Sequence, residues 1–77
     1  TKNQRKNLTP GLRKQIILRD QYTCQMCGKQ MPDGVGLQID HIIPIARGGK
    51  TISSNLRVLC SNCNAKKGSK LDEEILG

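Results

Sequence analysis

Four cysteines in two closely spaced pairs constrain the fold of this chain more than any other feature. Cys24 and Cys27 form one C-x2-C pair, Cys60 and Cys63 form another, and 32 residues separate the two pairs. Two residues between thiolates let one tight turn place both sulfurs about 2.3 Å from a single ion, and two such turns complete a tetrahedron. The spacing therefore predicts a structural metal site with four protein ligands and no open position, and zinc is the expected metal.

Disulfides and iron are the alternatives for four cysteines. Two disulfides need an oxidising compartment, which nothing else in the sequence indicates, and a redox-active C-x-x-C motif would not occur as a matched pair. An iron–sulfur cluster also takes four thiolates, but the local spacing is that of zinc knuckles. Zinc remains the prediction, with iron as the minor alternative.

The short chain makes such a cross-link necessary. With 77 residues it forms one domain, and a domain of this size buries too little apolar surface to offset the conformational entropy lost on folding. Tyr22 is the only aromatic residue, so the core must come from Ile, Leu and Val side chains. The cysteine site is expected to supply the missing stability.

The charge of the chain favours a polyanionic partner. Thirteen Lys and Arg face six Asp and Glu, and three of these acids, Asp72, Glu73 and Glu74, lie close to the C-terminus. The rest of the chain is therefore strongly basic, and each phosphate that a basic surface neutralises releases condensed counterions. Small domains also carry charge of this size for solubility alone, so charge by itself is weak evidence for such a partner.

Membrane and secretion signals are missing from the sequence. No stretch approaches the roughly 20 apolar residues that span a bilayer, and no apolar region marks a signal peptide. We therefore expect a cytoplasmic protein with no membrane partner. Because the chain begins with Thr1 and not Met, we also expect it to be a domain of a larger protein.

One helix is predicted before the first cysteine pair. Residues 1–8 are polar and basic without periodicity, and we expect them to form a flexible basic arm. Thr9 and Pro10 are typical of an N-cap and the first helical position, and apolar residues follow with helical spacing. These signals predict a helix over residues 10–20.

A pair of strands and a second helix are predicted between and beyond the cysteine pairs. Apolar residues over 37–43 indicate a strand that carries Asp40 and His41, and a Gly-rich turn at 47–50 leads into a returning segment over 52–59.

A helix is expected over residues 60–67, with Ser61 as N-cap and Gly68 as its stop. The predicted domain covers residues 9–70, and residues 71–77 are assigned to a C-terminal tail.

The order of motifs in this region is specific. It runs Ile39-Asp40-His41-Ile42-Ile43-Pro44, then Gly48-Gly49, then Asn55-Leu56, then Leu59-Cys60-Ser61-Asn62-Cys63-Asn64-Ala65-Lys66-Lys67-Gly68. Each part alone is weak, but their order inside paired C-x2-C knuckles is hard to reach by chance. Over about residues 9–68 the chain strongly resembles the HNH endonuclease family.

The resemblance implies a small α+β fold of the ββα-metal type, in which a β-hairpin packs on a helix, here with an N-terminal helix added and a structural four-cysteine zinc site. It implies that His41 lies on the first strand, that Asn55 ties the loop to backbone near His41, and that Asn64 lies on the helix. The motif reads His-Asn-Asn, as in the HNH domain of CRISPR effector nucleases, where the family often has a third His. An amide oxygen is a harder ligand than imidazole, which favours Mg²⁺ or Mn²⁺.

The residue types also fit phosphodiester hydrolysis on chemical grounds. Neutral imidazole is well matched to deprotonating water near pH 7, and His41 is the only histidine. A divalent ion on the Asp40 carboxylate and the Asn64 amide would stabilise the transition state and the leaving group. Asp40 and His41 are neighbours, which on a regular strand point to opposite faces, so we expect the strand to bend between them.

Four basic residues are candidates for phosphate contacts, and two other functions stay open. Lys67, and with less support Arg13, Arg47 and Lys66, are expected to hold the DNA backbone without reading sequence. The main alternative is a non-catalytic, zinc-dependent nucleic-acid-binding module, in which Asp40-His41 is structural. A zinc-stabilised protein-interaction domain is a third, weaker hypothesis.

Overall fold

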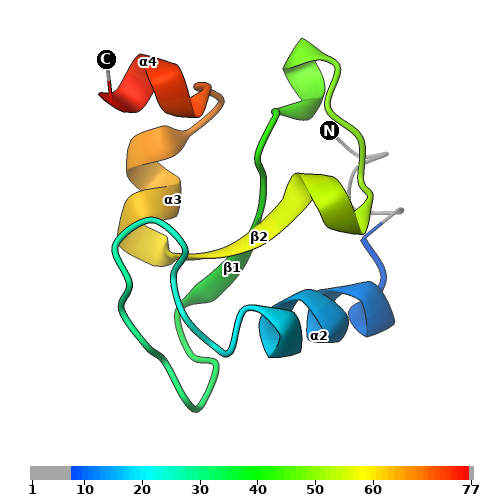
Figure 1. The fold of residues 1–77 in the computed structure, drawn as a ribbon, viewed down its shortest axis with the longest axis vertical. Coiled ribbons are helices and arrows are strands. Elements are labelled where there is room, and N and C mark those ends of the chain that lie inside the picture. Colours follow the sequence, from blue (N-terminus) through cyan, green and yellow to red (C-terminus); the bar gives the residue numbers. More distant parts are fainter. Residues whose placement is uncertain (1–7, 77) are drawn as a thin grey trace.

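A two-stranded antiparallel sheet with helices on both sides forms the centre of the molecule in the computed structural model, which describes residues 8–76 (Figure 1). The predicted basic arm lies, except for Leu8, outside the described residues. The elements in chain order are α2 (Pro10–Arg19), β1 (Leu37–His41), the 3-10 turns η1 (Ile45–Arg47) and η2 (Ser53–Asn55), β2 (Leu56–Cys60), α3 (Ser61–Lys67) and α4 (Asp72–Leu76). None of the helices in this part of the chain is long and apolar enough to cross a bilayer.

Helix α2 begins and ends with specific side-chain contacts. The Thr9 hydroxyl accepts a hydrogen bond from the Leu12 N–H at 3.1 Å, which confirms Thr9 as the N-cap. At the other end, the Asp20 carboxylate accepts a hydrogen bond from the Val58 N–H at 2.9 Å. This bond ties the end of α2 to the centre of β2, so the helix is fixed against the sheet.

The two faces of the hairpin have different partners. Leu37 pairs with Cys60 and His41 pairs with Leu56, which sets a regular antiparallel register. Since successive side chains on a strand alternate between faces, one face presents mainly apolar side chains to α2. The other presents polar side chains and the buried Leu59 toward α3. The face toward α2 carries the main core, made of Ile16, Ile17, Leu37, Leu56 and Val58, as predicted from the Ile, Leu and Val content.

The strand β1 is shorter than predicted. The sequence predicted a strand through Ile43, but β1 ends at His41. It ends there because the Asn55 side chain, and not a neighbouring strand, binds the Ile43 backbone. Asn55 Oδ1 accepts a hydrogen bond from the Ile43 N–H at 2.9 Å, and Asn55 Nδ2 donates to the Ile43 and Lys50 carbonyl oxygens at 3.1 and 2.8 Å. The backbone at Gly49 passes close to that at Ile43. A Cβ at position 49 would lie 1.7 Å from the Ile43 carbonyl oxygen, so only glycine fits there.

Two other differences concern the C-terminal part of the chain. Helix α3 has Cys60 as its N-cap and not Ser61, because the Ser61 hydroxyl donates to the Gly36 carbonyl oxygen at 3.0 Å. Gly68 ends the helix as predicted. The segment assigned to a tail contains helix α4, which lies beyond the end of α3 (Figure 1).

Candidate active site and metal cluster

The four cysteines converge on one point beside the start of α3. Their Sγ atoms all lie within 4.8 Å of one another, and the Cys27 and Cys60 sulfurs are 3.8 Å apart. Sulfurs at the corners of a tetrahedron with a bond length of 2.3 Å to its centre are about 3.8 Å apart. The cluster therefore has the size of a tetrahedral four-thiolate metal site, and this donor set favours zinc.

The backbone of the first cysteine pair favours the thiolate form. Burial raises the pKa of the Cys24 thiol. Hydrogen bonds from backbone N–H groups, including that of Cys27, have the opposite and larger combined effect and lower this pKa to about 6. Gly28 adopts the left-handed conformation directly after the turn, with φ of 80°. A thiolate is the form that binds a metal ion, so the turn is suited to that task.

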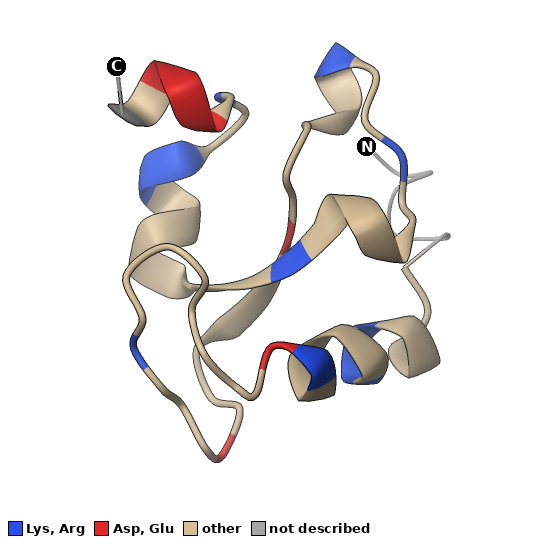
Figure 2. Cartoon of the chain, viewed as in Figure 1, with Lys and Arg blue, Asp and Glu red and all other residues tan. Residues whose placement is uncertain are grey.

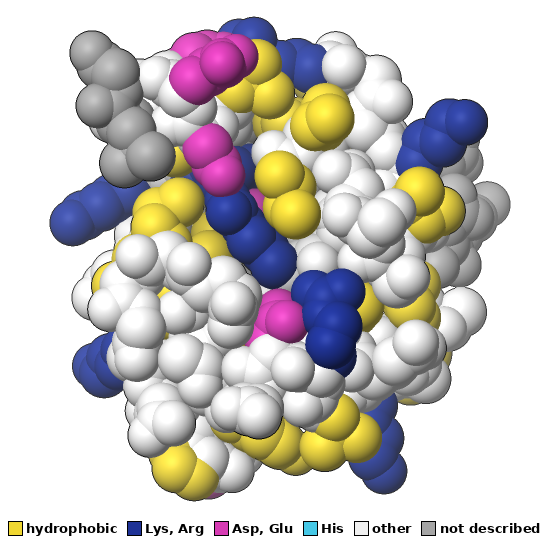
Figure 3. All heavy atoms as spheres, viewed as in Figure 1, with side chains coloured by type: hydrophobic (Ala, Val, Ile, Leu, Met, Phe, Trp, Pro, Cys, Tyr) yellow, Lys and Arg dark blue, Asp and Glu magenta, His cyan; other side chains and the backbone are white. Residues whose placement is uncertain are grey.

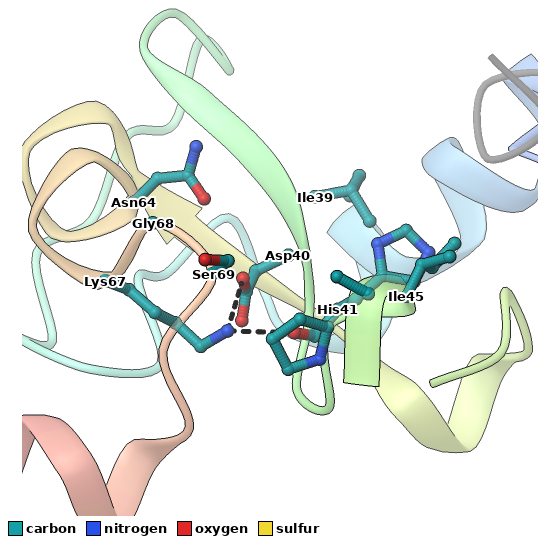
Figure 4. A pocket seen from close by; sticks show the side chains of 10 residues that line it. Ile39, Asp40, His41, Ile45, Asn64, Lys67, Gly68 and Ser69 are labelled. Carbon is teal, nitrogen blue, oxygen red and sulfur yellow. Dashed lines mark hydrogen bonds and ion pairs between the residues drawn. The ribbon is translucent and has the colours of Figure 1, made fainter. Parts of the chain in front are cut away.

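A pocket of about 320 Å³ lies between the end of β1, the end of α3 and η1. Its lining includes Asp40, His41, Asn64 and Lys67, which come from segments far apart in the sequence (Figure 4). The structure thus brings three residues of the motif, Asp40, His41 and Asn64, to one pocket.

Asp40 is buried in the floor of this pocket between two cations. Its side chain is 5% exposed; Oδ1 lies 3.1 Å from Lys67 Nζ, and Oδ2 lies 2.9 Å from Arg57 Nε. A carboxylate has about four lone-pair positions, so two remain for a metal ion. The carboxylate is held in one orientation but can still act as a ligand.

Asn64 contributes a carbonyl oxygen to the same side of β1. Its Nδ2 donates to Oε1 of Gln38, which lies two residues before Asp40 and shares its face. Figure 4 shows the amide oxygen of Asn64 turned toward Asp40, with the nitrogen turned away. A carboxylate and an amide oxygen fit Mg²⁺ or Mn²⁺, which keep several waters and need few protein ligands.

His41 leaves β1 on the other side. The strand stays regular through His41, so the predicted bend between Asp40 and His41 is wrong, and Figure 4 shows the ring and the Asp40 carboxylate on opposite sides of the ribbon. The ring Nε2 lies 2.9 Å from Thr51 Oγ1. Burial lowers the pKa of His41 below its usual 6.5, and Lys67 lowers it further against the opposing effect of Asp40. The imidazole is therefore neutral at pH 7.

Lys67 is buried, and its ammonium group is engaged by groups of the protein itself. Its side chain is 1% exposed, and besides Asp40 it binds the His41 carbonyl oxygen at 2.9 Å from Nζ. The prediction that Lys67 holds a phosphate is therefore corrected: because its ammonium group is enclosed by Asp40 and the end of β1, Lys67 is an internal counterion.

This assignment makes a prediction about stability. Lys67→Met leaves a buried carboxylate with one cation in place of two, and we expect it to lower the free energy of unfolding by about 3 kcal/mol. Lys66→Met, at the exposed neighbouring position, is the matched control and should change it by less than about 0.5 kcal/mol. Urea denaturation of the zinc-loaded variants measures both. If Lys67→Met and Lys66→Met instead lower stability by the same small amount and weaken DNA binding equally, Lys67 would be a phosphate contact and not an internal counterion.

The other predicted phosphate contacts are dispersed. Arg13 lies on α2, where its Nη2 donates to the Leu37 carbonyl oxygen at 3.3 Å, while Lys66 is exposed on α3. Arg47 is half exposed and pairs with Glu74 of α4, with 2.6 Å between Nη1 and Oε1. Lys and Arg are spread over several elements (Figure 2), and the face in Figure 3 shows them as separate groups. Of these three residues, Lys66 and Arg47 are direct sequence neighbours of residues that line the pocket.

Three residues of this region were not found by sequence reasoning. Arg57 lies opposite Asp40 in the strand register, and Asp72 follows on α4 and pairs with Arg57. Only the register places Arg57 beside Asp40, so no local sequence signal could have identified it. Gln38 could have been found, because alternation along β1 puts it on the face of Asp40.

Comparisons with known proteins show which family the chain is similar to. Residues 24–76 match the sequence model of a family described as HNH endonuclease. The chain is also 33% identical over 60 residues to the type IV methyl-directed restriction enzyme EcoKMcrA of Escherichia coli strain K12, a match that covers 71% of this chain and 22% of that protein. The family match contains both cysteine pairs, the hairpin and α3. With its ββα arrangement, its cysteine cluster and this match, the chain belongs to the HNH endonuclease family.

Proposed function

We propose that this chain is a metal-dependent endonuclease that hydrolyses phosphodiester bonds of DNA. The observation that carries the proposal is one pocket lined by Asp40, His41 and Asn64, on the ββα frame of a nuclease family. The buried, oriented carboxylate and the neutral imidazole are the groups that such hydrolysis requires near pH 7. We further propose that the cysteine cluster holds a structural Zn²⁺.

His41 is the proposed general base. In the tautomer whose Nε2–H donates to Thr51 Oγ1, the Nδ1 lone pair is left to take a proton from the attacking water. The ring and the Asp40 carboxylate leave β1 on opposite sides, so the scissile phosphate would span the end of β1. Asn55 acts indirectly, since its hydrogen bonds to Ile43 and Lys50 fix the loop that follows His41.

Asp40 and Asn64 are the proposed ligands of the catalytic ion. Mg²⁺ or Mn²⁺ bound there would offset negative charge that develops on the phosphate and the leaving oxygen. Lys67 and Arg57 already neutralise Asp40, so the carboxylate alone attracts a further cation weakly. We therefore expect the ion to bind mainly with DNA, whose phosphate adds negative charge and a ligand oxygen.

The partner and the setting follow from the same argument. We propose that DNA is bound through its phosphate backbone, with Arg47 and Lys66 near the pocket and Arg13 further away. The relative is by name a methyl-directed restriction enzyme, and the match spans 22% of that protein. We propose that the shared part supplies cleavage and that the chain is one domain of a larger protein. A site of four thiolates fits the reducing cytoplasm, where cysteines are kept out of disulfides.

Relaxation of supercoiled plasmid tests the proposal. The zinc-loaded chain should nick the plasmid with added Mg²⁺ or Mn²⁺, and should leave it intact when a mild chelator removes these ions but not the zinc. Gel-shift measurements in parallel report binding. Binding without nicking under every metal condition would contradict the proposal and favour the non-catalytic binding module.

A further inference from the structure

A chain of ion pairs links the proposed metal ligand to helix α4. Arg57 Nε donates to Asp40 Oδ2 at 2.9 Å, while Arg57 Nη1 and Nη2 donate to the two Asp72 oxygens at 2.9 and 2.6 Å. The Arg57 side chain is 13% exposed, against 38% for that of Asp72. One guanidinium group therefore joins a buried carboxylate in the active site to a carboxylate at the start of the last helix.

This arrangement uses the planar shape of the guanidinium group. Its fixed donors hold Asp40 along one edge and Asp72 by two parallel bonds along another, which restricts rotation of the Arg57 side chain. The hydrogen bonds from Arg57 lower the pKa of Asp72, so this carboxyl group is ionised at neutral pH and can hold Arg57. A lysine at position 57 would supply the charge but could not make both sets of bonds.

Helix α4 also pairs with η1, the turn that contributes two residues to the pocket lining. Its Glu74 pairs with Arg47 at the end of η1, and the two preceding residues of η1, Ile45 and Ala46, line the pocket. This second pair is exposed and contributes little to stability by itself. The two pairs together tie α4 to both β2 and η1.

We propose that Arg57 is a positioning residue for the Asp40 carboxylate and that Asp72 acts through Arg57, so that helix α4 belongs to the active-site framework. This inference rests on the proposed nuclease function, in which Asp40 binds the catalytic ion. A carboxylate whose orientation is fixed loses less freedom when it binds a metal ion, and partners that orient ligands commonly contribute roughly 10–100-fold to metal affinity or activity.

Kinetics of Arg57→Lys and Asp72→Asn test the proposal. Each change should lower the maximal rate of plasmid nicking about tenfold while leaving the affinity for DNA unchanged. Asp72→Asn should have no further effect in the Arg57→Lys background, because Asp72 acts through Arg57. Glu73→Gln is the matched control, because it removes one negative charge from an exposed position of the same helix. This variant should nick at the wild-type rate.

Manganese binding separates this inference from the proposed function. Mn²⁺ affinity is measured by electron paramagnetic resonance on protein–DNA complexes carrying His41→Ala, in which the DNA stays intact. Arg57→Lys should weaken Mn²⁺ binding about tenfold, with zinc content and circular dichroism unchanged. Weaker Mn²⁺ binding in Arg57→Lys would support the positioning role even if the wild type fails to cut DNA. Failure of the wild type to cut would contradict only the nuclease proposal.

Three results would overturn the positioning role. The first is wild-type nicking and Mn²⁺ affinity in both Arg57→Lys and Asp72→Asn, which leaves the nuclease proposal intact. The second is an equal loss in Glu73→Gln, which would indicate a general charge effect of α4. The third is an Asp72→Asn effect of the same size with and without Arg57→Lys, which would mean that Asp72 acts by another route.

Discussion

His41→Ala is expected to slow plasmid nicking in Mg²⁺ by about a thousandfold, within the range by which a positioned general base accelerates a reaction. His41 is the only histidine in the chain, and its neighbour Asp40 is occupied by two cations, which makes it a poor replacement as a base. Single-turnover nicking rates, measured with enzyme in excess over plasmid, give the size of the loss directly.

The His41→Ala variant should remain folded and bind DNA. Its only side-chain hydrogen bond among the described residues is to Thr51, and no predicted phosphate contact involves the ring. Zinc content, thermal unfolding and gel-shift affinity should therefore match those of the wild type. A loss of less than about tenfold in nicking, well below what a general base contributes, would mean that another group activates the water, and the role assigned to His41 would be wrong.

Loss of zinc is expected to unfold the whole domain. Structural zinc sites contribute roughly 10 kcal/mol or more of apparent binding free energy, whereas a core this small supplies only about 3–5 kcal/mol. Cys60 is also the last residue of β2 and the N-cap of α3, so its ligand bond fixes both elements. Cys60→Ser should abolish stoichiometric zinc binding and the cooperative unfolding transition.

Asn62→Ser is the matched control for this substitution. Asn62 lies between Cys60 and Cys63 but is exposed, so the variant should keep one zinc per chain and a wild-type transition in circular dichroism. Treating the wild type with a strong chelator under reducing conditions should reproduce the Cys60→Ser result, and added zinc should reverse it. A chelated chain that still unfolds cooperatively near the wild-type temperature would refute the structural role of the metal.

The spacing of residues along the chain was sufficient to predict much of this protein. The two C-x2-C pairs predicted the cysteine cluster, because the geometry of a C-x2-C turn is local. Thr9 and Pro10 predicted the start of α2, and Gly68 the end of α3, for the same reason: caps depend on a few neighbouring residues. The motif order then predicted the ββα arrangement and the HNH family.

What the sequence could not decide depends on pairing across the hairpin and on burial. Register alone places Arg57 beside Asp40, and the packing of α3 on the sheet encloses Lys67, a residue whose sequence context indicates an exposed cation. Likewise, the hydrogen bonds of Asn55 end β1 at His41, although the apolar residues beyond it fit a longer strand. The sequence by itself determined which groups are candidates for the chemistry, since their types and spacing are local properties. Tertiary structure decided which of them meet, because contacts between distant segments depend on how the whole chain packs.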